Sequence, residues 1–135
     1  MNWSTSAIVL YSIFLGSILI YVPFLAVGYA RFQLGYDRSS PRGMFEQLPP
    51  YAQRATWAHQ NAFETFMVYA GAALMAYVTG VDSRLAAGAA IVFVGARLFY
   101  PLFYIFDLPW GRTLMFATGQ LCTYTLFILS FLQIQ

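Results

Sequence analysis

The sequence has no lysine, one cysteine and one histidine, and these absences exclude several kinds of functional site. A zinc centre needs several nitrogen or sulfur ligands, and His59 has no second ligand at a metal-binding spacing. Cys122 lies in an apolar stretch without a neighbouring base or cation, where a cysteine is usually an inert apolar side chain. The sequence therefore predicts neither a metal site nor catalysis by the protein's own thiol.

Charged side chains are also scarce, and their distribution indicates an integral membrane protein. They make up 9% of the 135 residues, whereas about 25% is usual in soluble domains. The mean hydropathy is +0.63, and residues 1–30 and 113–135 carry no charge. Runs of this length are typical of membrane spans, and the first lacks the basic start of a cleavable signal peptide. A net charge of +2 without a dense basic run gives no indication of nucleic-acid binding.

The apolar runs predict one all-α domain over residues 1–135, a four-transmembrane-helix bundle. We expect the spans near residues 6–30, 55–80, 85–106 and 110–132. Pro23 lies inside the first span and is expected to kink it. Short polar turns separate the later spans. A long connection over residues 31–53 follows the first, and the adjacent Pro49 and Pro50 argue against regular structure there.

The arginines predict the orientation of the bundle. One end carries Arg31, Arg38, Arg42, Arg54 and Arg112, and the opposite end carries Arg84. By the positive-inside rule, the long first loop is cytoplasmic and both termini lie outside. We therefore expect a multi-pass membrane protein in contact with membrane lipid.

A polar stripe follows one face of the second span. Arg54, Trp57, Asn61 and Glu64 are spaced at helical intervals. At 1.5 Å per residue, Glu64 lies about 15 Å along the helix from Arg54, near the middle of a hydrocarbon layer about 30 Å thick. An ionisable side chain at that depth is costly, so it needs a partner and usually has a function.

Arg97 stands at the matching depth in the third span, with Tyr100 and Tyr104 on its own helical face. Equal depth predicts an ion pair between Glu64 and Arg97, because either charge alone would be strongly desolvated. Spacing alone leaves two interpretations equally open: a structural clamp between helices, or a polar pocket for a charged ligand. For Arg112, at the start of the fourth span, spacing alone favours an interfacial side chain.

These residues resemble the MAPEG family, the membrane-associated proteins in eicosanoid and glutathione metabolism. Arg54-Ala-Thr-Trp-Ala-His59-Gln-Asn61-Ala-Phe-Glu64 resembles the second-helix signature, an arginine followed by Ala-His/Gln-x-Asn and a glutamate three residues after the asparagine. Ser40-Pro41 resembles the Asn-Pro that follows the first helix. Six further residues resemble the family's pattern in the third and fourth helices: Arg97, Tyr100, Tyr104, Arg112, Thr113 and Gln120. The resemblance covers nearly the whole chain.

The resemblance implies that glutathione binds between subunits, near the cytoplasmic side, in a divergent bacterial-type member of the inner membrane. Family members conjugate or isomerise lipophilic electrophiles, or reduce lipid hydroperoxides. The positions that match glutathione-binding residues are Arg54, Asn61, Glu64, Arg97 and Tyr104, with Arg31 nearer the loop in a lesser role. Arg112 matches the catalytic arginine that activates the thiol, and an adjacent guanidinium does favour the nucleophilic thiolate.

The resemblance also implies that the subunit forms a homotrimer. Gly71, Ala72, Ala73 and Ala76 lie on the second span, and small residues let membrane helices approach closely. We therefore expect the second helices of three subunits to meet around a three-fold axis.

Four positions depart from the family pattern. Trp57 stands where eicosanoid-making members carry a second arginine, and Gln60 replaces a basic residue of some members. Tyr100 replaces a histidine of some members, and Phe116 stands where a tyrosine is often found. These changes disfavour specialised leukotriene or prostaglandin synthesis. Three function classes stay open: a glutathione transferase or peroxidase, a non-catalytic scaffold or subunit of a larger membrane assembly, and a small transporter or lipid-binding protein.

Overall fold

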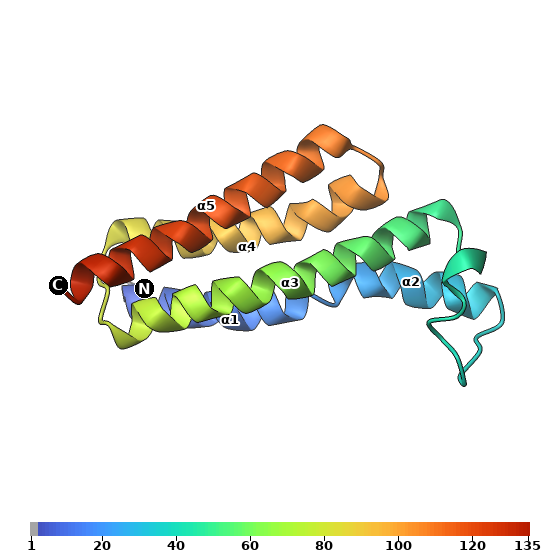
Figure 1. Ribbon diagram of the computed structural model, residues 1–135, viewed down its shortest axis with the longest axis horizontal. Helices are drawn as coiled ribbons and strands as arrows, with labels where there is room; N and C mark the ends of the chain where they lie inside the picture. The colour runs from blue at the N-terminus through green and yellow to red at the C-terminus, as the bar shows by residue number, and fades with distance from the viewer. Residues whose placement is uncertain (1–2) are drawn as a thin grey trace.

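The computed structural model describes residues 3–135, which form an all-α bundle (Figure 1). The helices are α1 (Thr5–Leu19), α2 (Val22–Gln33), α3 (Pro50–Val78), α4 (Arg84–Ile105) and α5 (Pro109–Gln133). A short 3-10 turn, η1 (Phe45–Gln47), lies in the connection between α2 and α3. The described residues contain no strand, as the sequence predicts.

The first predicted span consists of two consecutive helices, α1 and α2, with a break between them. Together they are called the first rod, and α3, α4 and α5 are the other rods. α1 ends at Leu19 and α2 begins at Val22, with Pro23 in the first turn of α2. Proline has no N–H and clashes with the preceding turn, so α1 cannot continue through it. The carbonyl of Ile20, at the break, accepts a hydrogen bond from Nδ1 of His59 on α3 at 2.7 Å. The predicted kink at Pro23 is confirmed, and α3 supplies a donor for the interrupted helix.

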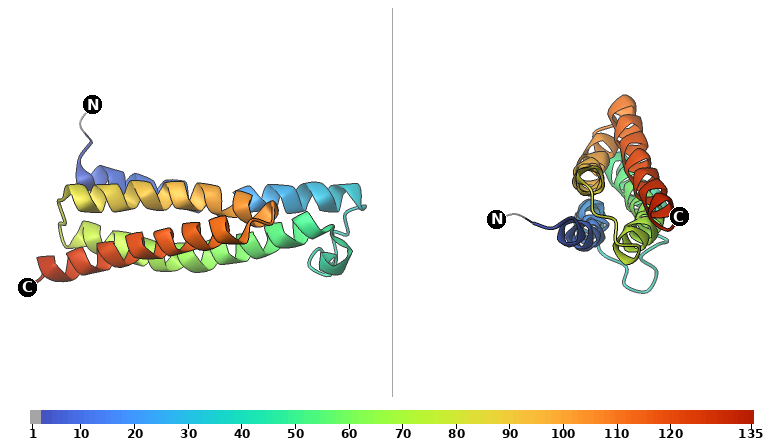
Figure 2. Two further views of the ribbon diagram at one scale, coloured as in Figure 1. Left: turned by 90° about the horizontal axis from the view of Figure 1, so that it is seen from above. Right: turned by 90° about the vertical axis from the view of Figure 1, so that its left-hand side faces the viewer.

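The rods pack side by side as an elongated bundle (Figure 2). α4 and α5 form an antiparallel hairpin, and α3 packs against α1, α4 and α5. α2 packs mainly on α3, because the α4–α5 hairpin ends short of the region where α2 and α3 continue (Figure 1). Both termini lie at one end of the bundle, and the α2–α3 connection lies at the other.

Alanines bring the helices of one subunit close together. Ala72, Ala73 and Ala76 of α3 are at most 1% exposed and belong to the same apolar core as Ala86 and Ala90 of α4. Their small side chains allow close approach of the backbones. These alanines of α3 therefore pack inside the subunit, and the sequence-based expectation that they meet other subunits is wrong for them.

Polar contacts join α1 to the rest of the bundle at two levels. The hydroxyl groups of Ser12 and Tyr69 are hydrogen-bonded in the core, and the Tyr69 ring stacks on Phe93 with centroids 3.4 Å apart. Near the end of the bundle that holds the termini, Thr5 Oγ1 donates to Oδ1 of Asp82 at 2.7 Å. A buried polar group needs a hydrogen-bond partner. The two contacts therefore hold α1 against α3 at Tyr69 and against the α3–α4 turn at Asp82.

Three described segments are long and apolar enough to cross a membrane: Thr5–Gln33, Arg84–Ile105 and Pro109–Gln133. Large apolar side chains on them, such as Phe14 and Leu121, remain exposed on the surface of the bundle. An apolar outer surface of this kind suits contact with lipid. The chain is therefore an integral membrane protein. α3 is 29 residues long, but its polar stripe sets it apart from the three candidate spans.

The connection after the first rod is shorter than expected. α2 continues to Gln33, and α3 begins at Pro50 with Pro49 as its N-cap residue. A proline in the first turn of a helix breaks no intrahelical hydrogen bond, and its fixed φ suits that position. The two prolines therefore start α3 rather than prolong the irregular loop, and Arg54 lies within the helix.

Candidate functional site

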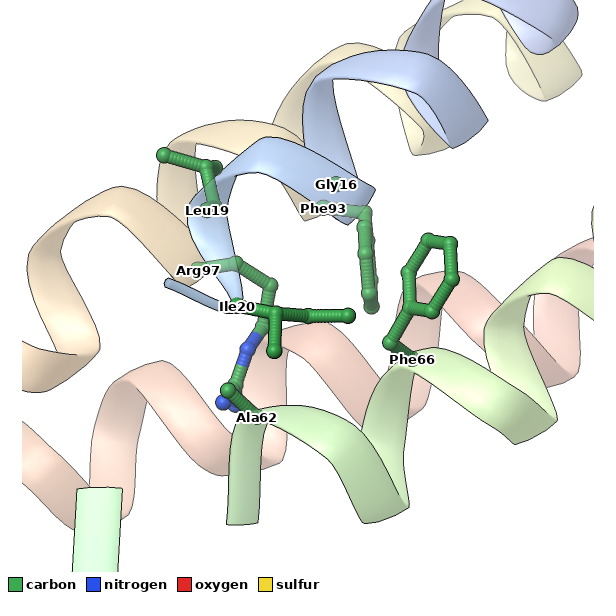
Figure 3. Close-up of a pocket in the computed structure, with 7 residues that line it drawn as sticks. All are labelled: Gly16, Leu19, Ile20, Ala62, Phe66, Phe93 and Arg97. Carbon is green, nitrogen blue, oxygen red and sulfur yellow. The ribbon is translucent and has the colours of Figure 1, made fainter. Parts of the chain in front are cut away.

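Arg97 is the least exposed charged side chain of the described residues, with 6% exposure. It extends from α4 towards Ala62 of α3, beside Ile20 (Figure 3). Its Nη2 donates to Oδ1 of Asn61 at 3.2 Å, and its guanidinium carbon lies 4.3 Å from the centroid of the Tyr100 ring. A buried cation needs such partners, because burial without them is strongly unfavourable.

The predicted ion pair between Glu64 and Arg97 is not formed within the subunit. Among residues 3–135, no arginine nitrogen lies within 4.0 Å of a carboxylate oxygen. Three residues advance an α-helix by about 300°, so Glu64 is turned about 60° around α3 from Asn61. Asn61 meets Arg97, whereas Glu64 is exposed and lines a cavity on the neighbouring part of that face of α3. The predicted partner of Arg97, Glu64, is therefore wrong, and Asn61 takes its place.

A row of side chains continues from Arg97 to the end of α4. The rings of Tyr100 and Tyr104 meet edge to face, with centroids 5.7 Å apart. The guanidinium carbon of Arg112, at the start of α5, lies 4.6 Å from the centroid of the Tyr104 ring. The structure thus brings four predicted site residues, Asn61, Arg97, Tyr104 and Arg112, into one connected row.

Arg54 and Trp57 of α3 flank this row. Nε of Arg54 donates to the carbonyl oxygen of Ile105 at 3.1 Å, which satisfies one of the free carbonyls at the end of α4. The Trp57 ring lies 6.5 Å from Tyr104 and 5.8 Å from Phe45 of η1, measured between centroids. Arg54 therefore links α3 to α4, and Trp57 places an aromatic surface beside the row.

A cavity of about 290 Å³, here called the Arg112 cavity, opens between α4 and α5. It is lined by Tyr100, Tyr104, Arg112, Thr113 and Phe116. Gly111 allows the close approach of α5 to α4 at this point, because a Cβ there would lie 2.7 Å from Cδ1 of Phe103. The tight hairpin therefore places Arg112 at the mouth of an open, partly polar cavity.

A larger cavity of about 1000 Å³, here called the α2–α3 cavity, lies between α2, the α2–α3 connection and α3. Glu64 and Arg31 both line it. Arg31 is 8% exposed, and its Nε has no hydrogen-bond partner. The two cavities share no lining residue. Within one subunit, Glu64 and Arg31 thus line a different cavity from Arg112.

Sequence reasoning did not single out Arg42 and His59 as site residues, although both line the α2–α3 cavity. Arg42 lies in an irregular connection, where helical periodicity gives no position. His59 lies on α3, and its contact with the α1–α2 break depends on how two helices pack. Cys122 is buried in the apolar core, in keeping with an inert side chain.

Comparison with known proteins adds one further observation on the chain. The model of the MAPEG family matches residues 8–132, a range that contains both cavities and the connected row. No match was found among curated proteins or among solved structures.

Proposed function

The chain belongs to the MAPEG family, and we propose that it is a membrane-embedded, glutathione-dependent transferase or peroxidase that acts on lipophilic electrophiles or lipid hydroperoxides. The single observation that carries this proposal is the place of Arg112. Its guanidinium lies over the Tyr104 ring at the mouth of an open cavity, so a cation is held where a ligand's sulfur could approach it.

The donor set around the row fits the charges of glutathione. The tripeptide has two carboxylates and one ammonium group besides its thiol. Arg112 offers a guanidinium donor for the sulfur or a carboxylate, and Tyr104 adds a polar contact. Arg97 is buried and bonded to Asn61 behind Tyr100, so in this proposal the two residues support the site from behind its lining. Glu64 is the carboxylate of the α2–α3 cavity that could receive the ammonium group. A guanidinium–carboxylate contact is among the stronger hydrogen bonds available to a protein.

The separation of the two cavities supports a homotrimeric assembly as part of this proposal. Glu64 and Arg112 line different cavities of one subunit, and a ligand held between two copies of the chain can contact Glu64 of one copy and Arg112 of the other. In the proposed trimer, the α2–α3 cavity of one subunit faces the Arg112 cavity of the next. Gly71 of α3 is exposed and available for helix contact between subunits.

We also propose that α3 crosses the membrane with the three apolar rods, so that the subunit has four spans. The α2–α3 connection and the α4–α5 turn lie at the same end of the bundle (Figure 1). Five of the seven arginines lie at that end or in the adjoining turns. The positive-inside rule then makes it the cytoplasmic face of a bacterial inner membrane, with both termini outside.

The proposed chemistry needs an ionised thiol. With a pKa near ~8.5, a free thiol is mostly protonated at neutral pH. Arg112 favours the thiolate by placing its positive charge beside the sulfur, and Thr113 is the nearest hydroxyl in sequence. With an aryl halide as the acceptor, the thiolate forms a sulfur–carbon bond and halide leaves, while the thiol proton goes to water.

Turnover in detergent tests the proposal. Wild-type protein should conjugate glutathione to 1-chloro-2,4-dinitrobenzene or reduce cumene hydroperoxide with it. Arg112→Leu should reduce kcat by about 10²–10³-fold, as for the loss of one electrostatic contact to developing charge. Glutathione affinity should fall much less. Arg84→Leu, at the opposite end of the bundle, is the matched control and should leave kcat unchanged. Absence of glutathione binding at millimolar concentration would refute the proposal.

Mixed trimers test whether the site lies between subunits. Glu64→Gln should weaken glutathione binding and Arg112→Leu should lower kcat, and co-expressed subunits of the two variants should regain activity at low glutathione concentration. With random mixing, about one quarter of the intersubunit sites combine an intact Glu64 with an intact Arg112, as follows from two independent choices of subunit. If both residues act within one subunit, mixing restores nothing.

The apolar residues beside the row favour a second candidate, a non-catalytic scaffold or a subunit of a larger membrane assembly. Trp57 packs beside Tyr104, and Phe116 lines the Arg112 cavity without a hydroxyl group. A scaffold would be stable without glutathione and would show no turnover with either substrate. It would also retain its fold and oligomeric state in the Arg112→Leu variant.

A further inference from the structure

We infer that His59 is a positioning residue, which holds α2 against α3 and thereby fixes Arg31 in the wall of the α2–α3 cavity. The structural part of this inference needs no ligand. Its consequence for glutathione rests on the proposed function, in which the α2–α3 cavity receives part of the tripeptide. His59 acts through α2 and not as a group that touches the ligand.

The break between α1 and α2 leaves a carbonyl group for which α3 supplies the donor. Pro23 has no N–H and interrupts the helical hydrogen bonds, and Ile20 lies between the two helices. Nδ1 of His59 donates to the carbonyl oxygen of Ile20 at 2.7 Å. A carbonyl oxygen only accepts, so this bond places a proton on Nδ1. The bond therefore ties the start of α2 to a defined point on α3.

Aromatic side chains hold the ring of His59 in the orientation that this bond needs. Its centroid lies 5.7 Å from that of Tyr21 and 5.2 Å from that of Phe24, both at the start of α2. Phe63, one turn further along α3, meets the ring edge to face with centroids 5.4 Å apart. These separations are typical of favourable aromatic pairs. His59 is thus joined to the start of α2 through its ring as well as through Nδ1.

Phe24 continues the contact from the break to the last turn of α2. Its ring packs against His59, and the guanidinium carbon of Arg31 lies 5.8 Å from the centroid of the same ring. All three side chains line the α2–α3 cavity. Arg31 is 8% exposed and its Nε has no hydrogen-bond partner, so this donor can serve a ligand in the cavity. Where the donor lies depends on how α2 lies on α3.

α2 depends on this contact because few other parts of the bundle support it. The α4–α5 hairpin ends short of the region where α2 continues (Figure 1), and α2 packs mainly on α3. Val27 and Ala30 of α2 share an apolar cluster with Ala52 and Ala55 of α3. Apolar packing is non-directional, so the hydrogen bond of His59 supplies the directional contact that sets the position of α2.

Hydrogen–deuterium exchange of the full-length protein in detergent, without glutathione, tests the structural part. In His59→Leu, which lacks the donor, amides of residues 24–33 should exchange about fivefold faster, as expected when a local opening loses one hydrogen bond. His59→Asn should stay close to wild type, because its amide nitrogen takes the place of Nδ1. His59→Gln, whose amide nitrogen takes the place of Nε2, should behave like His59→Leu. The comparison of Asn with Gln decides the matter even if the Leu variant does not fold.

Gln33→Leu is the matched control for exchange. Gln33 is exposed, and its Nε2 donates to the hydroxyl oxygen of Tyr29 within α2. Its replacement removes a side-chain hydrogen bond from the same helix without touching α3. Exchange over residues 24–28 should therefore stay at the wild-type rate.

Steady-state kinetics with glutathione and 1-chloro-2,4-dinitrobenzene test the consequence for the site. His59→Leu should raise the KM for glutathione about fivefold and leave kcat unchanged, because Arg112 stands on α5. Arg31→Leu should raise KM at least as much. The double variant should have the same KM as Arg31→Leu alone, since His59 acts through Arg31.

Three results would overturn the inference. Unchanged exchange in both His59→Leu and His59→Gln would show that the hydrogen bond does not hold α2. Restoration of the wild-type KM by His59→Gln but not by His59→Asn would assign His59 to direct contact with glutathione. Additive increases in the double variant with Arg31→Leu would indicate the same direct contact. If wild-type protein binds no glutathione, the proposed function fails, and exchange without glutathione still decides whether His59 holds α2.

Discussion

Replacement of Asn61 by leucine should show how the bundle holds a buried guanidinium. The substitution keeps a similar shape and removes the one side chain that accepts a hydrogen bond from Arg97. Arg97 is 6% exposed, so water cannot readily replace the lost acceptor. We expect Asn61→Leu to lower the free energy of unfolding, although the substituted residue is more apolar.

The magnitude follows from the contacts that are lost and kept. A hydrogen bond to a charged group contributes about 1.5–3 kcal/mol. Arg97 keeps its position over the Tyr100 ring at 4.3 Å, a contact that contributes about 0.5–2 kcal/mol. Asn61→Leu should therefore lower the free energy of unfolding by about 2 kcal/mol. This is less than the 3–5 kcal/mol typical of a broken buried ion pair. Glu64→Gln should cost less than about 0.5 kcal/mol, as is usual for exposed positions.

Double-mutant cycles measured by unfolding in mixed micelles separate these contacts. The cycle of Asn61→Leu with Arg97→Met should give a coupling energy of about 1.5–3 kcal/mol, as expected for residues in direct contact. The cycle of Glu64→Gln with Arg97→Met should give almost none. A larger coupling for Glu64 than for Asn61 would refute the assignment and restore the ion pair predicted from sequence.

Two further predictions concern the packing of α1. Gly16→Ala should be about 1–3 kcal/mol less favourable than Gly28→Ala, because the new Cβ would lie 3.0 Å from Cε2 of Phe66 and that ring must shift. Gly28→Ala, with nothing within 4 Å of its Cβ, should not be destabilising in the same unfolding assay. Ser12→Ala should cost about 1–3 kcal/mol by leaving the Tyr69 hydroxyl unpaired. Adding Tyr69→Phe should recover part of that loss, and purely additive losses would contradict the hydrogen bond.

The rods could be predicted from sequence because hydropathy and helix breakers depend on neighbouring residues. The observed bounds of α4 and α5 lie within one residue of the predicted spans. Pro23 broke the first rod as expected, because a missing N–H acts within one turn of the chain. The prediction extended the irregular connection to residue 53 because of Pro49 and Pro50. Proline occurs both after the end of a helix and in the first turn of one, and here the two prolines start α3. The two roles of proline differ in whether the residues that follow it continue as a helix.

The contacts between rods could be predicted only in part. Periodicity places Asn61 and Glu64 on neighbouring parts of one helical face, about 60° apart. Which of them meets Arg97 depends on how far α3 is rotated about its axis against α4. The buried alanines set that rotation by packing side chain against side chain. Equal depth along two helices is therefore insufficient evidence for an ion pair.

The unequal lengths of the helices explain why polar groups gather where they do. The α4–α5 hairpin stops short of the end of α2 and α3 (Figure 1), so that end of the first two rods has no third helix of the subunit against it. Arg31 lines the α2–α3 cavity at that end, and Arg112 stands at the turn where the hairpin stops. Charged side chains near a membrane need partners, and among residues 3–135 no carboxylate oxygen lies within 4.0 Å of an arginine nitrogen. Arg97 and Arg54 are instead hydrogen-bonded to Asn61 and to the carbonyl oxygen of Ile105. A counter-charge for Arg31 or Arg112, which line the two cavities, would therefore come from outside the subunit, and the proposed neighbouring subunit and glutathione each offer a carboxylate.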